Sequence, residues 1–146
     1  MKLSNKGRYA VQALADLARN NLQKPTNLTE ISLRQGISIS FLEQIFLKLK
    51  KSHLVQSARG PHGGYVLSKA PEEIKLSNII NAVDEKIKTV ACRRESKRGC
   101  HGKSFKCITH DLWDDLETHI NSFFEKNTLK DIVYRVSKRQ QKELNQ

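Results

Sequence analysis

The sequence predicts a mainly α-helical fold: a winged helix-turn-helix with a two-stranded β wing, then a cysteine-rich loop and a long C-terminal helix. Three observations predict this fold. Two short amphipathic helical segments flank a turn at Gly36, and a glycine-rich hairpin pattern follows them over residues 54–67. The three cysteines all lie within one 16-residue window, just before a strongly amphipathic segment.

The first two helices are predicted from apolar spacing and from capping residues. Ser4 can cap a helix whose apolar residues recur every three or four positions and which ends before Pro25. Thr29 is predicted to cap a short helix over residues 30–35. Gly36 ends this helix, because glycine readily adopts the left-handed conformation that follows a helix C-terminus.

The third helix is predicted to begin with a capping box and to present its polar face to DNA. Ser40 and Glu43 have the Ser-x-x-Glu spacing of such a box, and apolar residues at helical spacing follow to about Ser52. A short helix, a turn with glycine and a second amphipathic helix form the helix-turn-helix pattern, in which the second helix can enter the major groove.

The hairpin that follows is predicted to be the wing. Residues 54–59 and 65–67 are typical of strands, and the turn between them reads Gly60-Pro61-His62-Gly63-Gly64. Beyond Pro71, Ser77 is predicted to cap a helix over residues 78–85.

The last long helix is predicted to mediate dimerisation. Thr109 can cap it, and its apolar stripe is wide enough to pack against a partner subunit; the stripe comprises Leu112, Leu116, Ile120, Phe123 and Phe124. The predicted organisation is a DNA-binding domain over 1–85, a cluster-binding loop over 86–110, the dimerisation and C-terminal helices over 111–136 and a disordered tail over 137–146.

The charge distribution indicates a phosphate-rich partner. Lysine and arginine number 26 against 15 acidic residues, for a formal net charge of +11 in 146 residues. Residues 1–80 contribute +7 and residues 81–110 contribute +5, whereas residues 111–146 contribute −1. The basic surface therefore belongs to the helix-turn-helix half and the cysteine loop, which favours nucleic acid as the partner.

The sequence also excludes several classes of protein. It contains no apolar stretch of about 18 residues and no secretory signal pattern, which argues against a membrane protein and predicts a cytoplasmic one. Three clustered cysteines do not form a disulfide framework. An enzyme with Cys107 as nucleophile and His110 as base is disfavoured, because no other residues form a substrate or oxyanion site.

The candidate DNA contacts lie on the third helix and on the wing. Polar residues off the apolar stripe are suited to base edges, and these are Ser38, Ser40, Glu43 and Gln44. Gln44 can pair with adenine and Glu43 can accept from cytosine. Arg59 stands beside the hairpin turn, where it can reach a narrow minor groove. The alternative is that Ser40 and Glu43 only cap the helix and that Arg59 is an ordinary surface residue.

The candidate metal ligands are the three cysteines and a nearby histidine. Cys92, Cys100, Cys107 and His110 bring thiolate and imidazole ligands into one short, basic segment, with His101 as an alternative fourth ligand. Structural zinc usually takes a close Cys-x(2–4)-Cys pair, which is lacking here, so the wide spacing favours an iron-sulfur cluster. Unligated thiols in a flexible loop are the other possibility.

Several motifs together resemble the IscR family of iron-sulfur cluster assembly regulators, over residues 1 to about 133. They read LSNKGRYAV from Leu3, ISLRQGIS from Ile31, FLEQ from Phe41, RGPHGGY from Arg59 and CITHDLW from Cys107. The resemblance implies a dimeric winged helix-turn-helix regulator with a [2Fe-2S] cluster held by Cys92, Cys100, Cys107 and His110. It also implies base contacts from Ser38, Ser40, Glu43 and Gln44, and a minor-groove contact from Arg59.

The function implied is regulation of iron-sulfur cluster assembly genes by a homodimer on a pseudo-palindromic operator in double-stranded DNA, with repression and activation both open. Iron-sulfur cluster donor proteins are candidate partners, and no membrane partner is expected. One alternative is an iron- or nitric-oxide-responsive repressor of the same family with a different cluster; Arg8 weighs against it, since the nitric-oxide-sensing branch has an acidic residue there. The other is a zinc-stapled DNA-binding protein without sensing.

Overall fold

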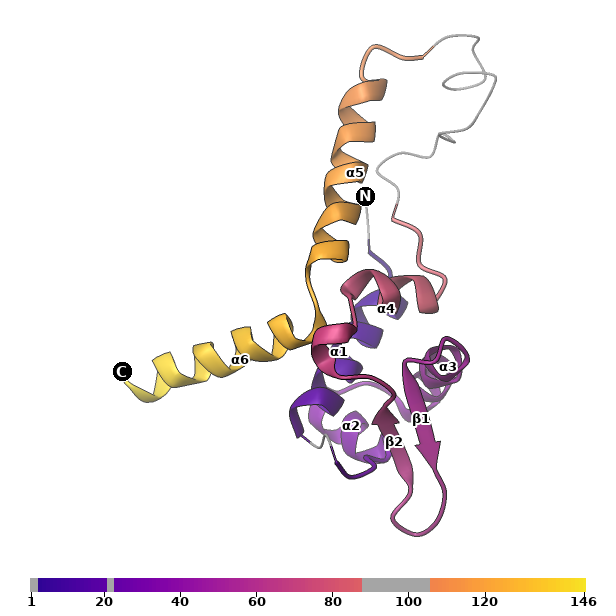
Figure 1. Cartoon of the computed structure of the whole chain (residues 1–146), viewed down its shortest axis with the longest axis vertical. Coiled ribbons are helices and arrows are strands. Elements are labelled where there is room, and N and C mark those ends of the chain that lie inside the picture. Colours follow the sequence, from indigo (N-terminus) through magenta and orange to yellow (C-terminus); the bar gives the residue numbers. More distant parts are fainter. Residues whose placement is uncertain (1–2, 21–22, 88–105) are drawn as a thin grey trace.

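A computed structural model describes residues 3–20, 23–87 and 106–146. Along the chain the elements are α1 (Asn5–Asn20), α2 (Leu28–Gln35), α3 (Ile39–Lys51), β1 (Val55–Ala58), β2 (Gly64–Leu67), the 3-10 helix η1 (Pro71–Glu73), α4 (Leu76–Ala82), α5 (His110–Lys126) and α6 (Leu129–Leu144). The first four helices and the hairpin form one lobe, from which α5 and α6 project in different directions (Figure 1). The winged helix-turn-helix predicted from the sequence is confirmed.

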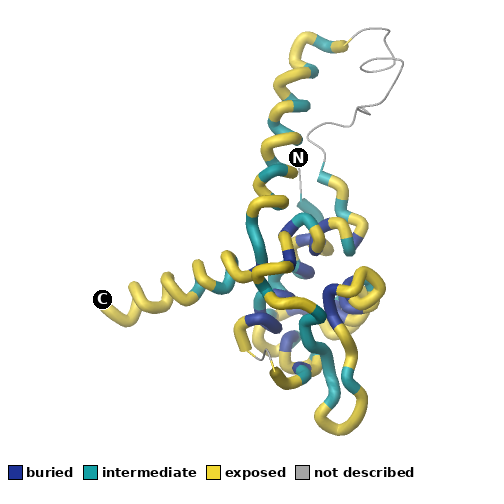
Figure 2. The backbone as a smooth tube through the Cα atoms, viewed as in Figure 1, coloured by how far each residue is buried: buried dark blue, intermediate teal, exposed yellow. Residues whose placement is uncertain are grey.

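The core of the lobe is built from the apolar faces that the helical spacing predicts. The buried side of α1 supplies Ala10, Ala13, Leu14 and Leu17, and that of α3 supplies Leu42, Ile45, Phe46 and Leu49. Figure 2 shows the buried residues concentrated in this lobe, while α5 and α6 are mostly exposed or half-buried. The core therefore fixes the position of α3 from within and leaves its outer face to solvent.

Two helices begin at different residues from those the sequence predicts. Asn27, not Thr29, caps α2: its side chain accepts a hydrogen bond from the backbone of Glu30 at 2.9 Å. Ser38, not Ser40, caps α3, because its hydroxyl accepts from the backbone of Phe41. Ile37, just before this cap, and Leu42, four residues after it, are both in the buried core and hold the two positions of a hydrophobic staple, which favours the earlier serine.

The end of α2 lies where the sequence predicts it, whereas the start of α4 does not. Gly36 ends α2 with a φ of 67°, as predicted, and its backbone N–H bonds to the carbonyl of Ser32. The helix α4 begins at Leu76 after Lys75, so Ser77 lies inside its first turn instead of capping it. The hydroxyl of Ser77 donates to the Glu125 carboxylate on α5 at 2.7 Å.

The wing is a two-stranded antiparallel hairpin tied to the backbone that precedes α2. Its register pairs Val55 with Leu67 and Ala58 with Gly64. A bridge joins Tyr65 to Thr26, through N–H···O bonds of 3.0 and 2.8 Å in the two directions. Gly64 has a φ of 152°, and a Cβ placed on it would lie 2.3 Å from the carbonyl oxygen of Thr26. This close approach requires glycine.

A buried carboxylate joins α1 to α2. The Asp16 side chain has no exposed surface and receives hydrogen bonds from the Arg34 guanidinium, the shortest at 2.8 Å, and from the Gln35 amide at 2.7 Å. The hydrogen bond to Asp16 raises the pKa of Arg34. Asp16 therefore sets how the first helix of the helix-turn-helix is held against the core.

A short backbone pairing anchors the junction between α5 and α6 to the lobe. The N–H of Leu76 donates to the carbonyl of Asn127 at 2.9 Å, and the N–H of Leu129 donates to the carbonyl of Ile74 at 2.8 Å. Lys75 and Thr128 form the bridge between them, and Leu129 is completely buried. The two projecting helices thus leave the lobe from a fixed point.

The helix α6 is longer than the sequence predicts. Residues 137–146 were expected to form a disordered tail, yet α6 continues to Leu144. Two hydrogen bonds support the extension: the Ser137 hydroxyl donates to the carbonyl of Val133, and Arg19 of α1 donates to the Gln140 side chain at 2.8 Å. Composition alone could not indicate this longer helix, because the contact between α1 and α6 joins segments that are far apart in the sequence.

Candidate DNA-binding surface and metal-binding segment

The outer face of α3 carries the predicted base contacts. Ser38, Ser40, Glu43 and Gln44 are all exposed, whereas Leu42, Ile45, Phe46 and Leu49 of the same helix are in the core. Because Ser38 provides the cap, Ser40 and Glu43 are not used to close the helix, and the interpretation that they serve only as a capping box is wrong. Their side chains remain accessible to a ligand in the first two turns of the helix.

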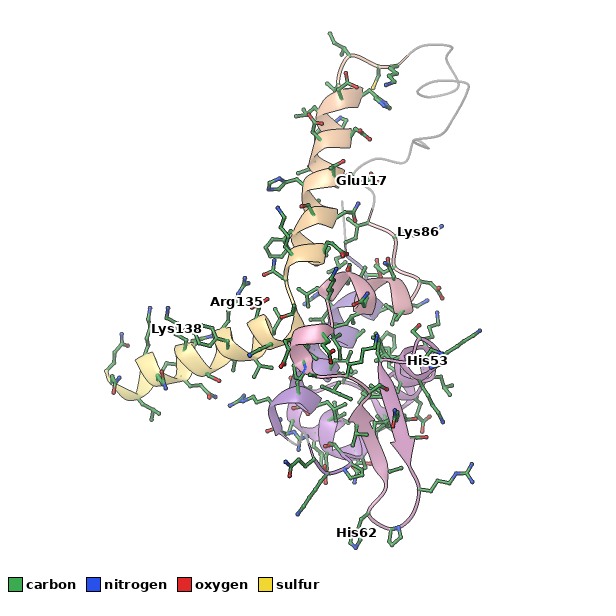
Figure 3. All side chains as sticks on the ribbon, in the orientation of Figure 1. His53, His62, Lys86, Glu117, Arg135 and Lys138 are labelled. Carbon is green, nitrogen blue, oxygen red and sulfur yellow. The ribbon has the colours of Figure 1, made fainter. Side chains whose placement is uncertain are left out.

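The wing presents the predicted arginine at its turn. Arg59 directly follows β1 and is exposed, as are Gly60 and Pro61. Figure 3 places His62 at the far tip of the hairpin, away from the lobe. The structure therefore places Arg59 in the loop of the wing rather than against the core, as a minor-groove contact requires.

The C-terminal end of α3 is basic, and it contains two contacts that the sequence reasoning missed. The Lys50 ammonium donates to the Ser57 hydroxyl of β1 at 2.8 Å. The Lys48 ammonium lies 2.9 Å from the carboxylate of Asp84, which follows α4. Thirty-six positions separate Lys48 from Asp84, so no local spacing could have revealed this pair.

The segment just after Asp84 is tied to the start of α1. The Glu85 carboxylate accepts from the backbone N–H of Ser4 at 3.1 Å and also from the Ser4 hydroxyl. Partial burial raises the pKa of Glu85, but these bonds, together with one from the backbone of Gly7, outweigh it and hold the pKa below its usual value. A Cβ at Gly7 would lie 3.1 Å from the Ile80 side chain and 3.4 Å from that of Glu85, so glycine lets both side chains approach α1 closely. Ser4 was predicted as the helix cap, and its side chain serves this contact.

Two of the four predicted metal ligands lie together at the start of α5. The backbone N–H of His110 donates to the carbonyl of Cys107 at 3.0 Å, so the two residues belong to one turn. Both side chains are half-buried. Thr109 occupies the cap position without a capping bond, and its hydroxyl instead accepts from the Trp113 indole at 3.2 Å.

The other predicted ligands, Cys92 and Cys100, and the alternative ligand His101 lie outside the described residues. Among residues 3–20, 23–87 and 106–146, no group of three or more histidine, cysteine or acidic side chains comes together to hold a metal ion. A cysteine and a histidine on one turn, next to Lys106 in the sequence, are suited in their chemistry to an iron-sulfur cluster.

The apolar stripe of α5 is exposed or half-buried within a single chain. No residue of α5 is buried; Leu112 is 58% exposed and Phe123 is 48% exposed. Phe124 packs against the core of the lobe, next to its edge-to-face partner Phe123. Neither α5 nor any other helix of the described ranges is long and apolar enough to cross a membrane.

Comparison with known sequences connects these features to one family. Residues 3–135 match the model of the Rrf2 family, described as an iron-dependent transcriptional regulator. A relative from Aliivibrio salmonicida, named HTH-type transcriptional regulator IscR, is 47% identical over 145 residues, which cover 96% of this chain and 84% of the relative. A protein of the same name from Serratia proteamaculans is 47% identical over 133 residues, covering 91% and 79%.

Solved structures agree with the sequence comparison. The global cysteine regulator CymR of B. subtilis superposes with a TM-score of 0.77 at 28% identity, over 92% of this chain and 98% of that one. IscR from T. potens also gives 0.77, at 32% identity, over 96% and 91%. The chain therefore belongs to the Rrf2 family of iron-dependent transcriptional regulators, and it is a winged-helix DNA-binding regulator of the IscR type, not an enzyme.

Proposed function

We propose that this chain is a homodimeric regulator of iron-sulfur cluster assembly genes in the cytoplasm, whose binding to double-stranded DNA depends on a [2Fe-2S] cluster. The observation that carries the proposal is the turn at the start of α5 that contains both Cys107 and His110. It belongs to a regulator whose recognition helix α3, called the reading helix below, has an exposed outer face. Repression is the expected action when clusters are plentiful. Cluster donor proteins would load the cluster. Its loss would change the DNA preference of the regulator and so allow activation at other promoters.

On the DNA side, each exposed residue has a separate role. Gln44 would hydrogen-bond to adenine and Glu43 would accept from cytosine, while Ser38 and Ser40 would donate to bases or phosphates at the start of α3. Arg59 would enter the neighbouring minor groove from the wing. Glu43 also repels phosphates, so it penalises sites that offer no base donor, and this discriminates between promoter classes.

The exposed face of α5 supports the dimer. Leu112 and Phe123 would stay exposed to water unless a second chain covers them, and a two-fold pair of α5 helices would bury the same residues on both chains. Two reading helices related by this axis would require a pseudo-palindromic operator, with half-sites separated by about one turn of DNA.

On the metal side, Cys92, Cys100, Cys107 and His110 are the proposed ligands. When bound, the cluster supplies a group whose presence reports iron and sulfide supply and redox conditions. The chain's own part is to fix Cys107 and His110 on one turn and to hold Thr109 against Trp113. The segment is also rich in lysine and arginine, whose charge would favour the ionised form of the thiols.

Metal and sulfide analysis tests this proposal. We expect anaerobically purified protein to absorb visible light and to contain about two iron and two labile sulfide ions per subunit. Replacing one ligand, in Cys107→Ala or His110→Ala, should lower the iron content and alter or abolish the visible spectrum. His119→Ala is the matched control, because His119 lies on the same helix but outside the proposed ligand set, and it should leave both unchanged.

The same sample distinguishes the alternatives. Colourless protein that contains zinc and no sulfide would contradict the sensor and indicate a zinc-stapled DNA-binding protein. About four iron and four sulfide ions per subunit would indicate the related repressor with a different cluster. A wild-type spectrum in both ligand variants would contradict the assignment of those ligands.

The role of Arg59 can be tested by DNA binding. Arg59→Ala should weaken binding about tenfold at operators with a narrow A-tract minor groove, because such grooves concentrate the negative potential that attracts arginine. The measurement is fluorescence anisotropy on paired duplexes that differ only in their A-tracts. Arg139→Ala on α6 removes the same charge far along the chain from the wing and serves as control. An equal loss on both duplexes would reduce Arg59 to a phosphate contact.

A further inference from the structure

We propose that Lys48 is a DNA-phosphate contact of the reading helix and that Asp84 occupies its ammonium in the absence of DNA, so that the protein must break this pair to bind. The inference rests on the proposed function in one respect: it requires that the outer face of α3 meets DNA. It adds a binding residue, Lys48, and a residue that limits affinity, Asp84.

The position of Lys48 on α3 is the first argument. Lys48 follows Gln44 by four residues and Ser40 by eight, so the three side chains lie along one face of the helix. Gln44 and Lys48 also line the same open hollow of about 320 Å³, together with Lys6 and Val83. A duplex contacting Gln44 would thus present its phosphates within reach of the next turn of α3.

The surroundings of Asp84 are the second argument. Its carboxylate lies 2.9 Å from the Lys48 ammonium, and 79% of the Asp84 side chain is exposed. The hydrogen bond and the charge of Lys48 lower the pKa of Asp84, and the charges of Lys6 and Lys51 act in the same direction. Asp84 is therefore a carboxylate facing three lysines, in the place where a phosphate would otherwise be attracted.

The backbone around Asp84 holds this residue where it can compete with DNA phosphate for the Lys48 ammonium. Asp84 adopts a left-handed φ of 57°, and its N–H donates to the carbonyl of Asn81 at 3.1 Å. The N–H of Glu85 donates to the carbonyl of Ile80, and the Glu85 side chain is bound to Ser4 of the α1 end. These bonds keep Asp84 beside α3, where its carboxylate competes with a phosphate for the charge of the Lys48 ammonium and repels the phosphate.

The expected size of the effect follows from the exposure of the pair. Ion pairs between exposed side chains change an equilibrium constant by up to about fivefold. The substitution Asp84→Asn removes the charge and keeps a residue that tolerates a positive φ, so the backbone should be preserved. It should therefore tighten binding about two- to fivefold on a specific or a non-specific duplex.

A double-mutant cycle on the full-length protein, with equal metal content in all samples, tests the proposal. Lys48→Gln should weaken binding, and Asp84→Asn should give little further gain in that background. In the wild-type background, Lys48→Gln should also reduce the salt dependence of log K by about 0.9, the value for one lost phosphate contact. Glu72→Gln is the matched control, because it also removes one exposed carboxylate. Glu72 lies on η1, which packs against α6 and, within the described part of the chain, makes no extensive contact with α3.

Four results would overturn the proposal. If Asp84→Asn binds no tighter than Glu72→Gln, or if its gain is equally large with Lys48 replaced by glutamine, Asp84 acts only through net charge. Unchanged affinity and salt slope in Lys48→Gln would remove Lys48 from the interface. Wild-type protein that binds no duplex at all would instead refute the proposed DNA-binding face, and the inference with it.

Discussion

Replacing Gly64 with alanine should displace the wing and reduce DNA affinity at least tenfold. An alanine Cβ would lie 2.3 Å from the carbonyl oxygen of Thr26 and 2.7 Å from the backbone nitrogen of Asn27, and both are main-chain atoms that cannot turn aside. The pairing of Tyr65 with Thr26 would have to open. With the strain of a positive φ added, we expect a loss of about 3 kcal/mol in the free energy of unfolding. Urea denaturation and anisotropy measure the two effects.

The matched control for this prediction is in the same hairpin. Gly60 also has a positive φ, 111°, but a Cβ there would meet nothing within 4 Å. Gly60→Ala therefore reports backbone strain alone and should cost about 1–2 kcal/mol. If the two variants proved equally stable, the close approach of β2 to Thr26 would not be what holds the wing.

Replacing Asp16 with alanine should cause a comparably large loss of stability. The substitution leaves the Arg34 guanidinium and the Gln35 amide without their shared acceptor. Removing one partner of a buried pair costs about 3–5 kcal/mol, and because 38% of the Arg34 side chain is exposed, rehydration should limit the loss to about 3 kcal/mol.

Thermal and urea unfolding at one fixed protein concentration would measure the effect of Asp16→Ala, since the stability of a dimer depends on concentration. The double variant Asp16→Ala with Arg34→Ala should recover part of the loss by removing the unpaired charge. Glu72→Ala, which deletes an exposed carboxylate, should change stability by less than about 0.5 kcal/mol. A similarly small effect of Asp16→Ala would contradict a structural role for the buried pair.

The order of elements and most of the core could be predicted because they depend on local patterns. The spacing of Leu42, Ile45 and Phe46 on α3 indicates its buried face directly. Cap positions were harder, since Ser38 and Ser40 are equally good caps in isolation and the choice depends on where Ile37 is buried. The extent of α6 depends on its contact with α1, which appears in no local window.

In the candidate site, too, local patterns predicted the exposed residues but not the contacts between distant parts of the chain. The exposure of Glu43, Gln44 and Arg59 follows from their places outside the apolar pattern, and the sequence located all three. The Lys48–Asp84 and Ser4–Glu85 contacts join residues 36 and 81 positions apart, so only a folded chain reveals them. The roles of Cys92 and Cys100 remain predictions of the sequence and of the proposed function.

The backbone pairing of Ile74 and Leu76 with Asn127 and Leu129 should fix the spacing between the two operator half-sites that the regulator can bind. If two chains associate through α5, the distance between their reading helices is set by the angle at which α5 leaves the lobe, and two main-chain hydrogen bonds and a buried leucine hold that junction. A single base pair inserted between half-sites turns one of them by roughly 35° around the duplex axis. The protein would have to break the pairing or twist the DNA to follow, so operator spacing should be as strictly constrained as operator sequence.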